Sequence, residues 1–248
     1  MRITFLGTNG WYSSDMGNTV SILIETKKFY IILDAGDSLN KIDKYIKDAK
    51  PILIFLSHLH LDHIIGFHAF AKFRFNQIIN IYGLSGTKKG IEFIIKHPYS
   101  SPFADLSLKI KFHDLQEGTH NVGFPMTCKL LTHADPCLGY RFEIENKIIT
   151  YCTDTGICPN LYELAQNADV FISECSYKSG QEVWGWPHLK PEEAAEVAVK
   201  SEVKKLFLTH FDASTYTTIK ERKEAEKIAK KIFSNTIAAY DDLEIVIE

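Results

Sequence analysis

Three histidines and one aspartate stand within six residues, directly after a run of large apolar residues. The run, residues 52–56, predicts a buried strand, and the cluster after it consists of His58, His60, Asp62 and His63. Ligand sites in α/β sheets lie just past the carboxyl ends of strands. If residues 58–60 stay extended, His58 and His60 project to the same side, while Asp62 and His63 open the next helix. The segment therefore requires a fold that gathers polar side chains at one sheet edge.

Imidazole and carboxylate groups together are typical ligands of Zn²⁺, Mn²⁺ or Fe²⁺. A solvated polar loop is the plainer interpretation, but three histidines bunched after an apolar strand form a poor solvated loop. The cluster amounts to half a metal site, so further ligands must come from elsewhere in the chain.

Four later polar residues are candidates for the remaining positions. His133, Asp154 and His210 each follow an apolar run, and His188 precedes a predicted helix. Taken alone, each histidine could be an ordinary hydrogen-bonded surface residue. Asp154, which precedes Thr-Gly, and Asp34, which precedes Ala-Gly, could each be a turn former.

Short β-branched runs alternate with helical stretches along the chain, which predicts α/β structure with two sheets and helices outside them. The predicted strands are 2–6, 19–25, 29–33, 51–56, 78–82, 108–113, 124–131, 138–144, 147–152, 169–173, 205–209 and 243–247. The predicted helices are 38–47, 62–73, 85–96, 158–166, 191–200 and 217–233. The predicted loops 7–18, 97–107, 117–123 and 174–190 are candidates to border a site.

Length and composition suit a globular protein. The 248 residues fit a single domain over 1–248, and the formal net charge of −3 creates no overall positive field for nucleic acid. We find no signal-peptide pattern and no apolar run of membrane-spanning length, so no membrane contact is expected. The five cysteines form no Cys-x-x-Cys pair, and a reduced, cytoplasmic protein is the default expectation.

The order of these candidate residues resembles the motif set of the metallo-β-lactamase-fold superfamily, over essentially the whole chain. The residues are Asp34, the cluster at 58–63, His133, Asp154 and His210. The resemblance implies a four-layer αββα sandwich with two metal ions at one edge of its sheets. It implies one metal held by His58, His60 and His133, a second held by Asp62, His63 and His210, Asp154 as the bridge between them, and Asp34 as the support of a ligand imidazole.

Within the superfamily, the chain resembles ribonuclease Z and its small phosphodiesterase relatives. The single carboxylate bridge, the opening residues 1–8 and the stretch 169–175 followed by His188 carry this resemblance. In that branch a histidine that is not a ligand contacts the scissile phosphate or protonates the leaving group. The resemblance assigns that role to His188, with Glu174 as its partner.

The chain departs from ribonuclease Z in two respects. We find no long Gly/Pro-rich arm of the kind that grips tRNA, and no recognisable basic loop for the tRNA 3′ end. The segment 71–90 carries only Lys72, Arg74, Lys88 and Lys89, which could be a solvated helix surface. The compact form favours a small cyclic phosphodiester, of nucleotide or ribose cyclic phosphate type, over RNA as the partner.

These observations predict a dinuclear phosphodiesterase in which a metal-bridging hydroxide attacks the phosphorus and Asp62 orients it. Zn²⁺ is the default metal, with Mn²⁺ or Fe²⁺ as alternatives. Dimers are common in this branch, so a homodimer is also expected. Trp184 and Trp186 could stack on a base, but a loop hinge packed on the core or a dimer contact is the favoured interpretation.

Four alternatives stay open. The first is a tRNA 3′-processing endoribonuclease, and the second is a thioester or lactone hydrolase of the same fold. A di-iron oxidoreductase is disfavoured because relatives of that kind usually replace the second histidine of the cluster, here His60, and lack His63 as a ligand. A non-catalytic relative is disfavoured because every ligand position is filled.

Overall fold

The computed structural model describes residues 1–182 and 185–248 and divides into two compact units. We call residues 1–8, 17–115 and 241–248 unit 1, and residues 9–16 and 116–240 unit 2. Each unit contains one seven-stranded sheet with its own helices, so the predicted two-sheet α/β composition is confirmed.

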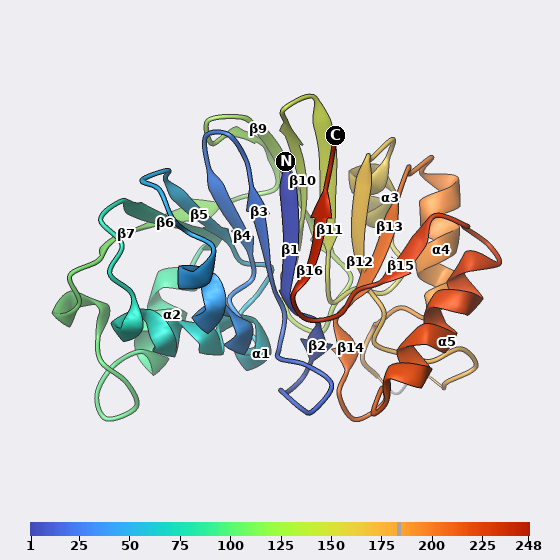
Figure 1. The fold of residues 1–248 in the computed structure, drawn as a ribbon, viewed down its shortest axis with the longest axis horizontal. Helices are drawn as coiled ribbons and strands as arrows, with labels where there is room; N and C mark the ends of the chain where they lie inside the picture. The colour runs from blue at the N-terminus through green and yellow to red at the C-terminus, as the bar shows by residue number, and fades with distance from the viewer. Residues whose placement is uncertain (183–184) are drawn as a thin grey trace. The chain divides into compact units, whose positions relative to one another are not determined.

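The sheet of unit 1 has the order β16-β1-β3-β4-β5-β6-β7. Its strands are β1 (Arg2–Gly7), β3 (Ser21–Glu25), β4 (Tyr30–Leu33), β5 (Ile52–Phe55), β6 (Ile78–Leu84), β7 (Lys109–Leu115) and β16 (Leu243–Val246). The strands from β4 to β7 run parallel, whereas β1 pairs antiparallel with both β3 and β16. The two chain termini therefore lie side by side in this sheet (Figure 1).

Helical segments cover one face of this sheet. They are η1 (Asp37–Lys44), α1 (Leu61–Ile64), η2 (Ile65–Lys72), α2 (Thr87–Ile94) and η3 (Phe103–Asp105). Ile32 and Ile54 of the sheet pack in one apolar cluster with Leu39, Phe67 and Phe70 of the helical layer. Burying a side chain of this size contributes about 1.5–3 kcal/mol, so the cluster holds the helical layer, and with it the start of α1, in place.

The sheet of unit 2 has the order β15-β13-β12-β11-β10-β9-β8. Its strands are β8 (Gly118–Asn121), β9 (Pro125–Leu131), β10 (Cys137–Ile144), β11 (Lys147–Cys152), β12 (Val170–Glu174), β13 (Leu206–Thr209) and β15 (Thr236–Ala238). The short strands β2 (Asn9–Gly10) and β14 (Phe211–Asp212) form a separate parallel pair in the same unit.

Helices α3 (Pro159–Ala165), α4 (Pro191–Lys200) and α5 (Ile219–Lys230) lie together on one side of the unit 2 sheet (Figure 1). Helix α4 has the predicted bounds, with Pro191 and two acids in its first turn, as suits a helix start. In α5, Thr218 and Glu221 form a capping box. Among the described residues, we observe no helix whose length and apolarity would suffice to cross a membrane.

Several predicted elements were wrong in kind or extent. The predicted loop 117–123 contains strand β8, whose alternate residues are exposed and which therefore lacks the apolar run that marks a buried strand. The predicted helix 38–47 is the 3₁₀ segment η1, and the predicted helix 62–73 splits into α1 and η2. Strands β2, β14 and β15 were missed because two or three residues hold too little periodicity to detect.

Candidate metal centre

Unit 1 holds the histidine cluster just past the end of β5. His60 is extended, with φ −62° and ψ 146°, and is the N-cap of α1, so Asp62 and His63 fall in the first turn. The His58 ring lies 4.3 Å from the His60 ring and 4.2 Å from the His63 ring, centre to centre. Within this unit the structure therefore brings the four predicted residues to one place.

Asp34 lies at the end of the neighbouring strand β4 and contacts the same cluster. Its Oδ2 is 2.8 Å from Nδ1 of His63, and both side chains are fully buried. The Ala35 N–H donates to the His63 carbonyl at 2.8 Å, and the Gly66 N–H donates to the Ala35 carbonyl at 2.8 Å. These bonds tie the turn after β4 to α1. The supporting role of Asp34 stays a prediction, and this contact is the one that such a role requires.

Unit 2 places Asp154 between two of the predicted histidines. Its Oδ2 lies 3.8 Å from Nε2 of His133, and its Oδ1 lies 3.1 Å from Nε2 of His210. Asp154 has a left-handed backbone with φ 55°, as do Asp34 with φ 55° and His210 with φ 52°. Non-glycine residues avoid this region at a cost of roughly 1–2 kcal/mol, and such strain clusters at functional sites.

The sequence analysis missed a close backbone contact that confines His210. A Cβ atom added to Gly10 would lie 2.5 Å from Cε1 of the His210 ring, so glycine is needed there. Gly10 belongs to β2, which pairs with β14 directly after His210. The buried Arg222 of α5 donates to Asn9 Oδ1 and lies over the Phe211 ring, 4.8 Å from its centre. No periodic pattern marks a two-residue strand, so only the pairing reveals this contact.

The fully buried Glu174 pairs with the partly buried His188 in unit 2. Nδ1 of His188 lies 2.7 Å from Oε1 of Glu174, whose carboxylate also accepts the backbone N–H groups of Thr155, Ser176 and Leu189 at 2.6, 3.1 and 3.3 Å. Burial opposes the charged form of His188, but the charge of Glu174 outweighs it and raises the pKa of His188 to about 9. Glu174 therefore joins three chain segments and stabilises the imidazolium form.

The predicted residues thus form one group in each unit. The group of unit 1 is Asp34, His58, His60, Asp62 and His63, and the group of unit 2 is His133, Asp154, Glu174, His188 and His210. Donor atoms of Asp154, Glu174 and His188 lie within 4.8 Å of one another. The Trp186 ring lies 5.8 Å from the His133 ring, centre to centre, whereas Trp184 lies outside the described residues. The role of Trp186 stays a prediction.

The donor chemistry of both groups fits a cation. His63 has the Asp34 carboxylate at Nδ1 and Oδ2 of Asp62 3.3 Å from its Nε2. A neutral imidazole carries one proton, so it can satisfy only one of two flanking carboxylates, and the other nitrogen needs a proton or a metal ion beside it. Imidazole nitrogens and carboxylate oxygens are ligands that Zn²⁺, Mn²⁺ and Fe²⁺ share.

Thiolate ligands do not fit this part of the molecule. Burial raises the pKa of Cys152 and that of Cys175 well above the ordinary thiol value. Buried thiols of this kind stay protonated at neutral pH, and a metal binds the thiolate. The donor set therefore consists of nitrogen and oxygen atoms.

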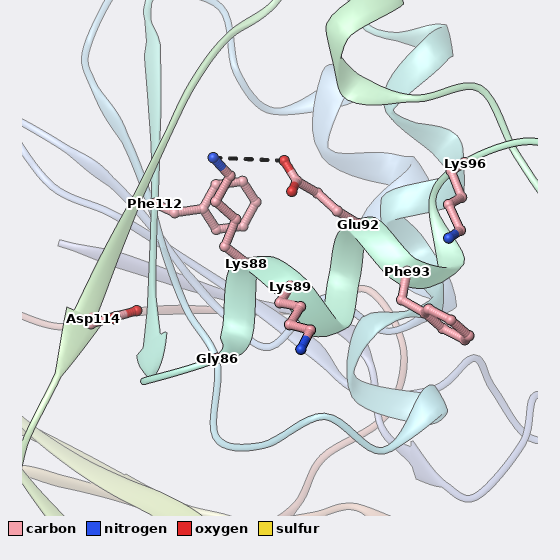
Figure 2. Close-up of a pocket in the computed structure, with 8 residues that line it drawn as sticks. All are labelled: Gly86, Lys88, Lys89, Glu92, Phe93, Lys96, Phe112 and Asp114. Carbon is pink, nitrogen blue, oxygen red and sulfur yellow. Dashed lines mark ion pairs between the residues drawn. The ribbon is translucent and has the colours of Figure 1, made fainter.

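One pocket of unit 1 lies between α2 and β7. It measures about 710 Å³ and is lined by the residues that Figure 2 labels, three of them lysines and two of them acids. Lys88 forms an ion pair with Glu92 at 3.9 Å, and Lys96 lies over the Phe93 ring, 4.7 Å from its centre. The acids offset two of the three lysine charges, so the pocket is not the basic groove that an RNA backbone would need.

Comparison with known proteins decides the family. The sequence model described as the beta-lactamase superfamily domain matches residues 30–211 of this chain. The chain belongs to the beta-lactamase superfamily. Its fold is similar to that of the metallo-beta-lactamase fold protein YhfI from Bacillus subtilis, with a TM-score of 0.82, 21% identity and 98% of both chains covered. The predicted metallo-β-lactamase fold is thereby confirmed.

Relatives of this superfamily member include ribonuclease Z proteins. Human tRNase Z, short form, has a TM-score of 0.79 at 22% identity over 100% of both chains. Ribonuclease Z of Bacillus velezensis is 24% identical over 311 positions, which cover 100% of this chain and 99% of that relative. The alignment exceeds the 248 residues of this chain, so at least 63 positions have no counterpart in it. The chain is a metal-dependent hydrolase and is ribonuclease Z-like, as predicted.

Proposed function

We propose that this hydrolase is a two-metal phosphodiesterase that acts on a small phosphodiester. The residues proposed to hold the metals are those of the sequence prediction, namely His58, His60, Asp62, His63, His133, Asp154 and His210. Zn²⁺ is the proposed metal because five imidazoles dominate the donor set. A homodimer and a cytoplasmic location stay predictions.

One observation carries the proposal: the two oxygens of Asp154 face different imidazoles. Oδ1 lies 3.1 Å from His210 Nε2, and Oδ2 lies 3.8 Å from His133 Nε2. A carboxylate that bridges two cations presents one oxygen to each of them. Because the resemblance implies that these two histidines bind different metals, the geometry of Asp154 supports a dinuclear site.

The Glu174–His188 pair supports phosphodiester chemistry. With Nδ1 bound to Glu174, the His188 ring directs its other nitrogen away from that carboxylate. Donor atoms of Asp154 and His188 lie within 4.8 Å of each other, so His188 borders the proposed metal site in its own unit. An imidazolium held there can neutralise a phosphate oxygen or donate a proton to a departing one.

The protein residues then have separate tasks. The metal ions, when bound, would activate water as the nucleophile and offset charge on the phosphate. Asp62 orients the attacking water and accepts its proton. His188 protonates the leaving oxygen, and Glu174 keeps its ring in place. A cyclic phosphodiester is opened to one product that carries a phosphomonoester and a free hydroxyl, whereas an acyclic one yields a phosphomonoester and an alcohol.

Two observations favour a small substrate over RNA. The chain lacks at least 63 positions of the ribonuclease Z to which it aligns over full length. The pocket on α2 carries nearly balanced charge, with three lysines and two acids. Sequence-independent RNA affinity comes mainly from cations that neutralise phosphates, and this pocket supplies little net positive charge.

The test is a substrate panel on zinc-loaded protein with metal analysis. The panel holds bis-p-nitrophenyl phosphate, 2′,3′- and 3′,5′-cyclic nucleotides, ribose cyclic phosphates, a thioester and a lactone. We expect two metal ions per chain and hydrolysis of at least one cyclic phosphodiester. Activity confined to the thioester or the lactone would refute the proposal, as would tightly held iron with oxygen reduction.

The second candidate function is tRNA 3′ processing. The names of the curated relatives support it, since the match to ribonuclease Z extends over the full length of this chain. Incubation with a precursor tRNA that carries a 3′ trailer distinguishes this function from hydrolysis of a small phosphodiester. Cleavage after the discriminator base at a higher kcat/KM than that for any cyclic phosphodiester would favour this second function.

A further inference from the structure

A buried serine touches one of the proposed ligand histidines in each unit. In unit 1, Ser57 Oγ lies 2.9 Å from Nδ1 of His58. In unit 2, Ser176 Oγ lies 3.1 Å from Nδ1 of His210. Both hydroxyls are buried, with relative exposures of 1% for Ser57 and 3% for Ser176. The sequence analysis singled out neither residue.

The direction of the bond between Ser57 and His58 follows from counting protons. Ser57 Oγ lies 2.8 Å from Oδ2 of Asp34, and an ionised carboxylate can only accept. The single hydroxyl proton of Ser57 therefore goes to Asp34. The oxygen can then only accept from the imidazole, so the proton of His58 lies on Nδ1. The Ser57 N–H also donates to Asp34 Oδ1 at 2.7 Å, which fixes the serine between the two.

The same count of hydrogen-bond protons applies to Ser176. Its hydroxyl donates to the backbone carbonyl of His210 at 3.0 Å, and a carbonyl oxygen can only accept. The hydroxyl oxygen must then accept from Nδ1–H of His210. Nε2 of this ring faces Asp154 Oδ1 at 3.1 Å, and that carboxylate competes for the ring proton unless a cation lies between the two atoms. An unrelated acceptor, a carbonyl in place of a carboxylate, thus produces the same proton placement in the other unit.

We propose that Ser57 and Ser176 are positioning residues that hold His58 and His210 in the Nδ1-protonated tautomer. This tautomer leaves the Nε2 lone pair free for a metal ion. In small imidazoles the two tautomers are close in energy, so a buried acceptor at Nδ1 selects one and fixes the ring orientation. The proposal rests on the proposed function for the identity of the ligand, while the proton placement rests on the hydrogen bonds alone.

The first experiment locates the ring protons. Long-range ¹H–¹⁵N NMR of imidazole nitrogens is recorded on metal-free protein, at a pH at which both rings are neutral, with His58→Gln and His210→Gln spectra for assignment. We expect a protonated Nδ1 on both rings in the wild type and a mixture of tautomers in Ser57→Ala and Ser176→Ala. A protonated Nε2 on either wild-type ring overturns the proposal for that residue.

The second experiment measures zinc affinity by competition with a chelator. Loss of a group that orients a ligand costs 10–100-fold in affinity, so we expect about that loss in Ser57→Ala and in Ser176→Ala. Ser57→Thr and Ser176→Thr keep the hydroxyl and should restore most of the affinity. Ser38→Ala and Ser173→Ala are the matched controls, because these serines are equally buried but donate to the backbone carbonyls of Thr19 and Glu174.

The outcomes separate this proposal from the proposed function. Wild-type zinc affinity in both alanine variants overturns the positioning role. Equal losses in the two control variants also overturn it, because the effect would then be general to buried serines. A wild-type protein that binds no zinc refutes the proposed function, and the tautomer measurement on metal-free protein still decides the proton placement.

Discussion

Glu174 holds His188 through a 2.7 Å contact to Nδ1, and the same carboxylate accepts the N–H groups of Thr155, Ser176 and Leu189. One buried acid thus stabilises the charge of an imidazole and joins the loop after β11 to the connection between β12 and α4. Glu174 makes no proposed contact with substrate, so its effect on turnover passes through His188.

Glu174→Gln should therefore lower kcat by about 10²-fold or more, because general acid catalysis contributes 10²–10⁴-fold. The double variant Glu174→Gln/His188→Ala should be no slower than His188→Ala alone, since two residues that act as a unit are not additive. The readout is kcat on bis-p-nitrophenyl phosphate, with metal content measured in parallel. Multiplicative losses in the double variant would contradict this coupling.

His210→Gly should be more stable than His210→Ala by about 0.5–1 kcal/mol. Both variants lose the imidazole, but only alanine keeps the strain of a left-handed backbone, at φ 52°. Urea denaturation of metal-free protein measures the difference. The matched control is the neighbouring Thr209 in strand β13, where alanine should be the more stable substitution. If the alanine variant is more stable than the glycine variant at both positions, strain at His210 is negligible.

The Asp169 carboxylate should make stability depend on acid pH. Burial opposes its ionisation, but the Lys204 ammonium at 2.8 Å and the Ile148 N–H at 2.8 Å outweigh it and lower its pKa. The unfolded chain then binds the proton more readily than the folded one. The stabilisation is therefore complete above the ordinary carboxyl pKa, about 3.9, and is lost as the pH falls below it.

We accordingly expect wild type to be more stable than Asp169→Asn at pH 6 and the difference to shrink by pH 3. Urea midpoints across this range provide the measurement. A difference that stays constant with pH would mean that the Asp169 charge plays no part. Glu143→Gln is the control, because Glu143 is an exposed acid of the same unit at the end of β10.

Charge reversal in the α2 pocket should separate small substrates from RNA. Lys89→Glu/Lys96→Glu should leave hydrolysis of a cyclic phosphodiester within about twofold of wild type, because a Debye length of about 10 Å at 0.1 M salt screens these exposed charges. The control is Lys220→Glu/Lys223→Glu on α5, which makes the same charge change in unit 2. A selective loss of precursor tRNA cleavage in the α2 variant would instead indicate that RNA docks there.

Removal of metal should lower the melting temperature. A ligand that binds only the folded state at a concentration of 100 times its Kd adds about 2.7 kcal/mol to the free energy of unfolding. Chelated protein should regain its melting temperature on addition of zinc, as calorimetry would show. In Asp154→Ala, which loses the proposed bridge, zinc should have much less effect. An identical response in that variant would exclude Asp154 as a ligand.

The strand pattern and the candidate residues could be predicted because both are local. Apolar runs identified most central strands within two residues, and α4 was predicted to the residue from Pro191 and the acids after it. Short strands and strands at the sheet edges were harder to predict. Strand β8 exposes alternate residues, and β2 consists of two residues that exist as a strand only because they pair with β14.

The sequence by itself determined the donor residues, since imidazole and carboxylate groups at the ends of apolar strands keep their chemistry in any fold. Tertiary structure decided how each donor is held. Ser57 and Ser176 are ordinary serines in the sequence, and Gly10 is one of 14 glycines. Ser57 adjoins His58 in the chain, but its hydrogen bonds to Asp34 span 23 residues. Ser176 lies 34 residues from His210, and Gly10 lies 200 residues from it. No local pattern encodes contacts of this range. Hydrogen-bond geometry, which depends on packing, therefore assigns the ring protons that the sequence leaves undetermined.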